Sequence, residues 1–281
     1  MKITNKLNLP QSFIFDDDRE FNPNRYSVTE LLCSTQEIFL KRKYYNEIEK
    51  DVSDTIPALF GSAVHYMLEK NTQETETLKS EYKIEYNIDG VDIVGIIDLL
   101  DLNNLTIKDY KTCSVSKITK NDFEDWRLQG LSYAWLVFNK LGVIIRKLKF
   151  IAIMKDWSKI KAATSSNYPS APVYIWEYDI SDSDFDFIER KIKNKISEIN
   201  SEYITECSDS ERWYSGTTYA VYKNANDKRA TALYDSEQEA HDYITNKLNG
   251  VGSISVRKGE YIKCKYYCDV CKFCKQYKEE N

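Results

Sequence analysis

Two carboxylates and an ammonium group lie inside strongly apolar sequence between residues 95 and 112, GIIDLLDLNNLTIKDYKT. This stretch predicts two β-strands joined by a polar turn. Asp98 falls within the first strand, whereas Asp109 and Lys111 fall two residues apart on one face of the second strand. Charged groups in buried β-structure are unfavourable unless they are paired or bound to a metal ion. The stretch therefore predicts a functional site.

A hairpin in this stretch brings the carboxylates of Asp98 and Asp109 together, and carboxylate oxygens are ligands for a hard divalent cation. Such a cation polarises a phosphate and lowers the pKa of a bound water, which makes a nucleophile. Lys111 beside that water or phosphate can stabilise developing negative charge. Asp101 is the rival to Asp98. Because they are three residues apart on one strand, the two point to opposite faces, so only one of them shares the site with Asp109.

Further motifs accompany these residues. The segment GSAVH ends at His65, GIID ends at Asp98, and QGLSY contains Gln129 and Tyr133 on one face of a predicted helix. Together with DYK at 109–111, and in this order, they resemble the PD-(D/E)XK nuclease superfamily. The resemblance is to its RecB-like branch, with AddB-type and CRISPR-associated exonucleases and phage-type members. The proline of the family's name is absent, since isoleucine precedes the aspartate of GIID.

The resemblance implies an α/β fold, namely a restriction-endonuclease-like core with a mixed sheet flanked by helices. It implies a Mg²⁺- or Mn²⁺-dependent DNA nuclease, an exonuclease or end-processing enzyme of phage or mobile-element recombination, replication or genome processing. It also implies four metal ligands: His65, Asp98, Asp109 and the backbone carbonyl of Tyr110. Lys111 would position and activate the water, and Gln129 and Tyr133 would orient Lys111 or the DNA backbone.

An alternative function is that of a nucleic-acid-binding or scaffold protein on a nuclease fold with weak or no catalysis. The intact set of His65, Asp98, Asp109 and Lys111 argues against it. Glu69, one turn after His65, is either a neighbour of the site or solvated. Glu85 on the preceding strand is a weaker candidate, Cys113 is expected in the core, and His241 is expected in solvent.

The composition is that of a soluble globular protein, with 281 residues of which 42% are hydrophobic and 30% charged. A net charge of −5 argues against wholesale attraction to a polyanion, although bound cations would neutralise the carboxylates of a metal site. Local basic clusters occur at 41–43 (KRK) and 146–149 (RKLK). DNA is the predicted partner, together with a phage recombination or replication protein.

No apolar run reaches the length of a transmembrane helix, and the first 20 residues lack a signal-peptide pattern. We therefore expect a cytoplasmic protein without a membrane partner, located in the host cytoplasm if it is phage-encoded. The oligomeric state cannot be predicted from the sequence. In this compartment the seven cysteines are expected as thiols or metal ligands and not as disulfides.

Four cysteines fall within eleven residues near the C-terminus, at Cys264, Cys268, Cys271 and Cys274. Clustered thiolates indicate zinc or an iron–sulfur cluster. The RecB-like resemblance implies a [4Fe–4S] cluster with one cysteine from the N-terminal region, where Cys33 lies. The tail spacing departs from the usual pattern, however, and phage-type members resemble this chain in CSDSERW at 207–213.

Three ligand sets therefore remain open. The first is preferred and combines Cys207 with Cys264, Cys268 and Cys274. The second replaces Cys207 by Cys33, and the third uses the tail alone and so includes Cys271. A metal in any of these sets would stabilise the C-terminal region without taking part in phosphodiester chemistry.

The remaining pattern predicts the elements that position these residues. A capping box at Ser27 and Glu30 starts a helix expected to continue to residue 45. Further helices are expected at 58–73, 121–140 and 182–205, and strands at 81–88, 91–102, 105–113, 146–155 and 173–180, with a loop at 156–171. Three regions follow: an N-terminal arm and helix at 1–56, a nuclease core at 57–205, and a cysteine-rich β-β-α-β module at 206–281.

Overall fold

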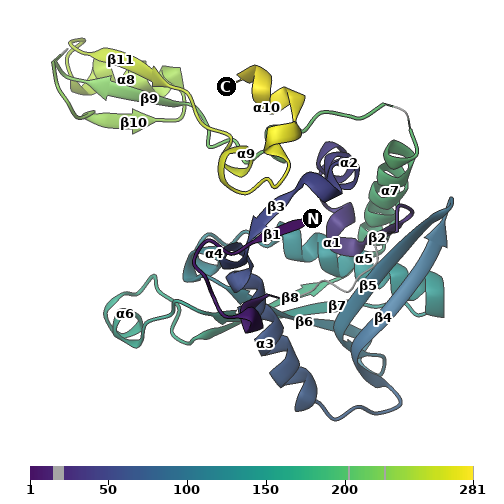
Figure 1. Ribbon diagram of the computed structural model, residues 1–281. Helices are drawn as coiled ribbons and strands as arrows, with labels where there is room; N and C mark the ends of the chain where they lie inside the picture. The colour runs from purple at the N-terminus through teal and green to yellow at the C-terminus, as the bar shows by residue number, and fades with distance from the viewer. Residues whose placement is uncertain (15–21, 202, 225, 281) are drawn as a thin grey trace. The chain divides into compact units, whose positions relative to one another are not determined.

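The computed structural model describes residues 1–14, 22–201, 203–224 and 226–280 (Figure 1). The chain divides into two compact units, Met1–Thr205 and Glu206–Asn281. Residues 1–56, which the sequence sets apart as an arm and helix, lie in the first unit, and 15–21 of that segment lie outside the described residues. No helix in the described ranges is long and apolar enough to cross a membrane.

The first unit is built on a mixed sheet with the strand order β2-β5-β6-β7-β8, in which β4 also pairs with β5. Its strands are β2 (Arg25–Ser27), β4 (Leu78–Ile88), β5 (Val91–Asp101), β6 (Thr106–Cys113), β7 (Lys147–Met154) and β8 (Val173–Asp179). The pairs β2–β5 and β6–β7 are parallel and the others are antiparallel. The expected α/β fold with a mixed sheet is confirmed. A separate pair of short parallel strands joins β1 (Lys2–Thr4) to β3 (Glu49–Asp51).

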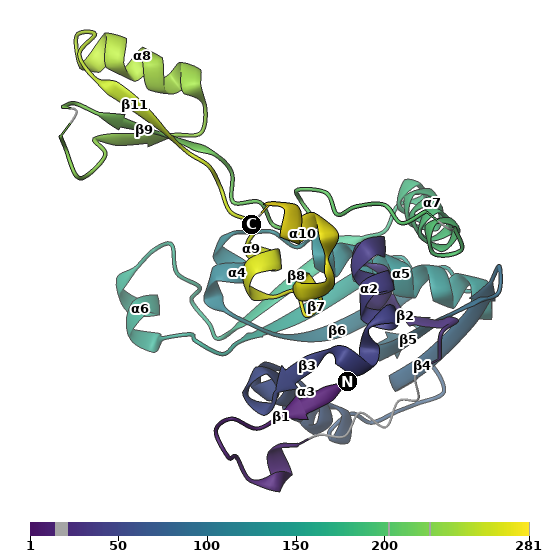
Figure 2. The same cartoon turned by 45° about the horizontal axis from the view of Figure 1, so that its top comes forward.

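Helices flank this sheet on both faces (Figure 2). They are α1 (Val28–Leu31), α2 (Thr35–Lys43), α3 (Ile56–Lys70), α4 (Val115–Thr119), α5 (Glu124–Leu141), α6 (Lys159–Thr164) and α7 (Asp182–Ile199). Helix α5 packs on the sheet and α7 packs on α5. Helix α3 contacts β6 on the opposite face of the sheet from α5. Gly61 of α3 lies beside Thr112, and the side chain of Thr112 points to the opposite face of β6 from that of its neighbour Lys111, which extends toward α5.

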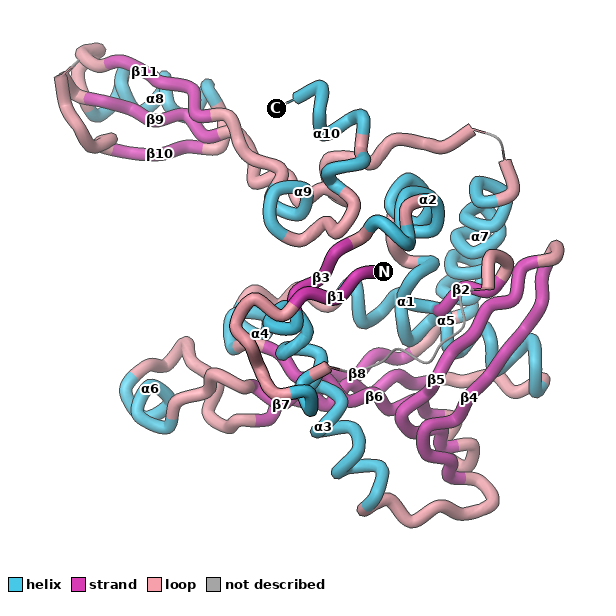
Figure 3. The backbone as a smooth tube through the Cα atoms, viewed as in Figure 1, coloured by secondary structure: helices cyan, strands magenta, loops and turns pink. Residues whose placement is uncertain are grey.

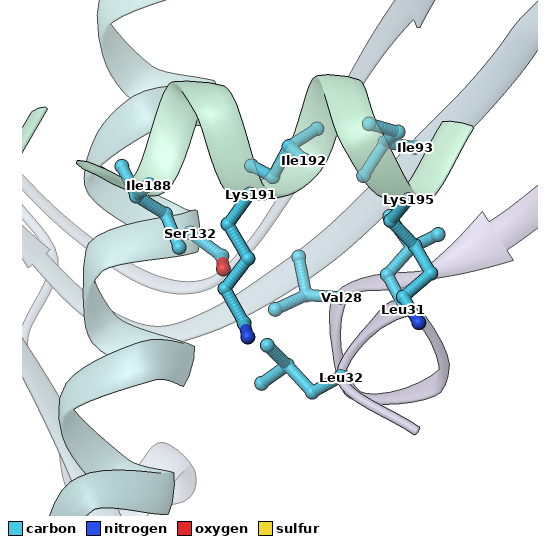
Figure 4. A pocket seen from close by; sticks show the side chains of 9 residues that line it. All are labelled: Val28, Leu31, Leu32, Ile93, Ser132, Ile188, Lys191, Ile192 and Lys195. Atoms are coloured by element: carbon cyan, nitrogen blue, oxygen red, sulfur yellow. The ribbon is translucent and has the colours of Figure 1, made fainter. Parts of the chain in front are cut away.

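A small pocket lies where α1 and α7 meet over β5 and α5 (Figure 4). Its lining is mostly aliphatic, with two lysines and one serine: Val28, Leu31, Leu32, Ile93, Ser132, Ile188, Lys191, Ile192 and Lys195. Lys195 donates a hydrogen bond to Thr35, and Ser132 donates one to the carbonyl of Leu128. The pocket shares no residue with the charged cluster predicted from the sequence.

The helix expected from Ser27 to residue 45 is two helices. Ser27 caps α1 as predicted, because its side chain accepts a hydrogen bond from the backbone of Glu30. Ser34 then caps α2 by accepting from the backbone of Glu37, and this second cap stops the chain from continuing as one helix. Helices α4 and α6 were not expected, and α6 lies within the expected loop at 156–171.

Strands β4 and β5 form a hairpin whose two-residue turn is Asp89–Gly90. Both turn residues have positive φ, 50° and 81°. That combination is characteristic of a type I′ turn, whose twist matches the twist of paired strands and which favours Asp-Gly. The turn therefore fixes which residue of β4 lies opposite each residue of β5.

Both basic clusters are largely neutralised by neighbouring side chains. In RKLK, Arg146, Lys147 and Lys149 pair with acidic residues on or beside β8, namely Asp182, Asp179 and Glu177. In KRK, Arg42 pairs with Glu30 and donates to the backbone carbonyls of Asn22, Pro23 and Arg25, at the start of β2. These four cations therefore have acidic partners within the first unit.

The second unit contains an antiparallel sheet in the order β10-β9-β11 and the helix α8 (Figure 3). The bounds are β9 (Thr218–Tyr222), β10 (Ala232–Tyr234), α8 (Glu237–Lys247) and β11 (Ser253–Arg257). Val221, Ala240 and Ile244 form its small core. Two short helices follow, α9 (Ile262–Tyr266) and α10 (Lys275–Glu280).

Two glycines allow α5 to lie directly on the sheet. A Cβ added at Gly95 would lie 2.9 Å from the ring of Tyr133 and 3.1 Å from Leu136. A Cβ added at Gly130 would lie 2.5 Å from the side chain of Leu148. Carbon atoms do not approach this closely without displacement. The glycine of GIID thus makes room for the tyrosine of QGLSY.

We predict that Gly95→Ala destabilises the protein by about 1–3 kcal/mol, because the buried Tyr133 ring cannot move away without strain. Gly61→Ala is the control, since its added Cβ would meet only Thr112 Oγ1 at 3.7 Å. That helical substitution should be neutral or stabilising by up to ~1 kcal/mol. Urea unfolding measures both values, and equal effects from the two variants would contradict the packing argument.

Candidate active site

The strands β5 and β6 separate at the predicted acidic residues. Their ladder has only three pairs, from Asp101↔Thr106 to Leu99↔Lys108. Beyond it β5 continues with β4 and, at Asp92–Val94, with β2, while β6 continues with β7. Asp98 and Asp109 are the next two positions in register, so they lie opposite each other where the strands part. Both are buried, with 6% and 2% of their surfaces exposed.

The backbone of Tyr110 points into this fork, where no strand satisfies its polar groups. Its N–H donates to Asp98 Oδ2 at 2.6 Å. Its carbonyl oxygen lies 2.9 Å from Nε2 of His65, within hydrogen-bond distance. Two side chains therefore replace the missing strand, one from β5 and one from α3.

His65 of α3 contacts both Asp98 and Tyr110. Its Nδ1 lies 3.3 Å from Asp98 Oδ1, and its ring stands edge-on to the ring of Tyr110. The hydrogen bond to Asp98 raises the pKa of His65, although burial acts in the opposite direction. In the metal-free protein the imidazole is therefore biased toward its charged form.

Lys111 extends from β6 toward α5, on the same face of the strand as Asp109. Its Nζ is 2.6 Å from Asp109 Oδ1 and donates to Gln129 Oε1 at 2.8 Å. The amide of Gln129 in turn donates to the hydroxyl of Tyr133 at 3.0 Å. Tyr133 is buried against Gly95, so this chain of contacts ends on a rigid group. The two residues of QGLSY thus position the lysine.

The carboxylate of Asp109 is strongly perturbed. Burial raises its pKa to about 6, with a further rise from the charge of Asp98, while Lys111 opposes the change. The Lys111 ammonium lies 2.6 Å from Oδ1 of Asp109 and is the charged partner of this carboxylate. A buried carboxylate that has a single charged partner retains lone pairs that can bind a cation.

Glu81 on β4 was missed in the sequence analysis. Its Oε1 lies 3.9 Å from Nδ1 of His65. Side-chain ligand atoms of His65, Glu81 and Asp98 all lie within 4.8 Å of one another. Among the described residues, these three form a group of side chains close enough to bind one metal ion. Burial raises the pKa of Glu81, and the charge of Asp98 raises it further.

The other acidic candidates lie outside this cluster. Asp101 accepts hydrogen bonds from the backbone and side chain of Asn104 and pairs with Lys108, so it stabilises the turn after β5. Glu85 pairs with Arg25. Glu69 is exposed, although its charge raises the pKa of Glu81.

Hydrogen bonds connect the chain segments that carry the cysteines of the second unit. The side-chain amide of Gln276 makes two hydrogen bonds with the backbone of Cys207. The N–H of Lys263, next to Cys264, donates to the carbonyl of Arg212. Cys113 is half-buried at the end of β6, and His241 is exposed on α8.

A family model described as the PD-(D/E)XK nuclease superfamily matches residues 28–275. No curated protein matches the sequence. Similar solved structures include SSO0001, at 17% identity, with 70% of this chain and 84% of that chain covered and a TM-score of 0.46. An alkaline exonuclease from Laribacter hongkongensis is 10% identical (64% and 89% covered, TM-score 0.37). A phage-related exonuclease from Haemophilus somnus 129PT is 12% identical (59% and 82% covered, TM-score 0.35).

We predict that Asp109→Asn stabilises the metal-free protein at pH 8. The pKa of Asp109 is raised by folding, so the folded state binds more protons and this group's contribution falls as the pH rises from about 4 through about 6. The amide avoids that loss, with a gain on the order of 2 kcal/mol at pH 8 that disappears near pH 4. Urea unfolding in EDTA across this pH range measures the difference.

Asp101→Asn is the matched control with the opposite sign. Burial raises the pKa of Asp101, but hydrogen bonds from Asn104 and the contact with Lys108 outweigh it and the pKa is lowered. That stabilisation is present at neutral pH and is lost as the pH falls, so the amide should be destabilising at pH 8. An Asp109→Asn variant that is less stable than the wild type at every pH would refute the explanation.

Proposed function

Because the chain belongs to the PD-(D/E)XK nuclease superfamily, we propose that it is a Mg²⁺- or Mn²⁺-dependent deoxyribonuclease that hydrolyses phosphodiester bonds at DNA ends. The observation that carries this proposal is the meeting of Asp98, Asp109 and Lys111 at the fork, with His65 added from α3. Two strands, β5 and β6, and the helix α3 contribute to that single cluster. Its members are the residues that the family pattern requires.

The donor set fits a hard divalent cation. Proposed ligands are His65, Asp98, Asp109 and the carbonyl of Tyr110, which offer oxygen and imidazole nitrogen. A bound cation supplies polarisation of the scissile phosphate and a water of lowered pKa. Asp98 also holds the Tyr110 N–H, which keeps the carbonyl of the same residue directed into the fork.

Lys111 is the group that meets the substrate in this proposal. Its side chain is 23% exposed, so a phosphate oxygen can reach Nζ. The side-chain oxygen of Gln129 accepts a hydrogen bond from the Lys111 ammonium, and the amide of Gln129 donates one to the hydroxyl of Tyr133. The lysine therefore stabilises negative charge on the phosphate from a fixed position, which lowers the cost of reorganisation during the reaction.

We also propose that the second unit holds an iron–sulfur cluster through Cys207, Cys264, Cys268 and Cys274. Tetrahedral zinc, with Zn–S bonds of about 2.3 Å, needs sulfurs about 3.8 Å apart. In a four-iron cluster each cysteine binds a different iron, so the sulfurs are further apart. These separations would distinguish the two metals in a structure of the metal-bound protein, and the resemblance to RecB-like nucleases favours the iron–sulfur cluster.

The central test is cleavage of end-labelled linear DNA and closed circular DNA with Mg²⁺, Mn²⁺ or EDTA. We expect metal-dependent degradation of the linear form and resistance of the circular form. Cleavage of closed circles would replace end-processing by endonuclease action. DNA binding without cleavage in any metal would indicate a binding or scaffold protein.

We predict that Asp109→Ala and Lys111→Ala abolish cleavage while leaving the fold and DNA binding largely intact. Gln129→Ala should reduce turnover by about 10–100-fold, because a residue that positions another group matters less than the group itself. The control is Gln238→Ala on α8, whose side chain contacts only Asp242 among the described partners. Near wild-type cleavage by either the Asp109 or the Lys111 variant would refute the assignment.

For the second unit, Cys268→Ser should lower the metal content and the melting temperature of anaerobically purified protein. Metal binding contributes to folding, and loss of a thiolate ligand weakens it. Elemental analysis for iron and zinc, together with the visible absorbance of an iron–sulfur cluster, identifies the metal. Undiminished metal in a Cys264, Cys268 and Cys274 triple serine variant would contradict the proposal.

A further inference from the structure

Glu81 has an unusual backbone conformation for its position. It lies inside the eleven-residue strand β4, yet its φ is +44°. Residues with a side chain rarely adopt this left-handed conformation, because Cβ approaches the neighbouring carbonyl oxygen. Such strain persists only where the surrounding structure imposes it. The neighbouring pairs Ser80↔Leu99 and Tyr82↔Ile97 are regular, so the distortion is confined to one residue.

The register explains which residue is affected. In the β4–β5 ladder Glu81 is the position opposite Asp98, and this is the one pair that the ladder lacks between Leu78 and Ile88. The missing pair coincides with the point where β5 parts from β6. Glu81, Asp98 and Asp109 thus occupy one row across three consecutive strands.

The distances in this row suit a cation. An octahedral Mg²⁺ with bonds of about 2.1 Å has neighbouring ligands about 3.0 Å apart and opposite ligands about 4.2 Å apart. His65 Nδ1 lies 3.3 Å from Asp98 Oδ1 and 3.9 Å from Glu81 Oε1, within that range. The contact of Nε2 with the Tyr110 carbonyl orients the ring so that Nδ1 faces the two carboxylates.

We propose that Glu81 is a cation ligand, acting with His65 and Asp98 on the β4 side of the fork. Asp98 then lies between two groups of ligands, one with Glu81 and one with Asp109. The half-exposed carboxylate of Glu81 places this position nearer to solvent than the buried Asp109. The inference rests on the proposed function, since it extends the ligand set of that same site.

The test is Mn²⁺ binding to the full chain, measured by titration calorimetry in the absence of DNA. Glu81→Gln removes the charge and keeps the size, and it should weaken Mn²⁺ binding by about tenfold or more or remove one bound ion. Glu69→Gln is the matched control, because it removes a nearby exposed charge from α3 that lies outside the ligand group. It should change the affinity less than about twofold, as expected for a screened surface charge.

A second variant separates ligation from folding. Glu81→Gly removes the carboxylate and suits the positive φ, so it should weaken Mn²⁺ binding as Glu81→Gln does without lowering the melting temperature of the EDTA-treated protein. Unchanged Mn²⁺ affinity and stoichiometry in both Glu81 variants would overturn the inference. Asp98→Asn must abolish binding. If Asp98→Asn still binds Mn²⁺, or if the wild type binds none, the proposed function is contradicted, independently of the role of Glu81.

Discussion

The separation of β5 from β6 is the constraint on which the candidate site depends. A continuous ladder would pair the N–H and carbonyl of Tyr110 with β5 and leave no room for other ligands. Where the strands part, Asp98 and His65 take over these two backbone groups. An unsatisfied buried backbone group costs about as much as a lost hydrogen bond, so the two side chains of the candidate site also contribute to stability.

The helices are placed in relation to that fork. Helix α3 has no buried residue, and it delivers His65 to the Tyr110 side of β6. Helix α5 lies on the opposite face, close to the sheet because Gly95 and Gly130 lack side chains. It contributes Gln129 and Tyr133, which hold the lysine. The cluster is therefore reached from both faces of a single sheet.

Local features of this arrangement could be predicted from the sequence, whereas relations between distant segments could not. The hairpin with Asp98 and Asp109 follows from apolar runs around a polar turn, and the cap at Ser27 follows from residue type. The parallel pairing of β2 with β5 is set by packing, which no local pattern encodes. The same holds for the pairing of the RKLK cations with acidic residues of β8, which has no signal within RKLK itself.

The position of Glu81 and the break between α1 and α2 could have been predicted from the sequence, but both were missed. Counting back from the Asp89–Gly90 turn places residue 81 opposite Asp98, because a two-residue turn fixes the register. The positive φ of Glu81 carries no such signal, since glutamate does not favour it. The second cap, Ser34 with Glu37, has the same spacing as the first and was overlooked inside an apparently continuous helical pattern.

The tight Asp89–Gly90 turn has a consequence for how this chain can change during evolution. A single inserted or deleted residue between positions 82 and 97 would shift β4 by one place against β5 and turn its side chains to the other face of the sheet. Insertions and deletions are therefore excluded over this interval. They can be accommodated between α3 and β4, at residues 71–77, because that segment is mostly exposed and polar. Among homologous chains, gaps should gather in that segment, and the interval of sixteen residues between the two acids should keep a constant length.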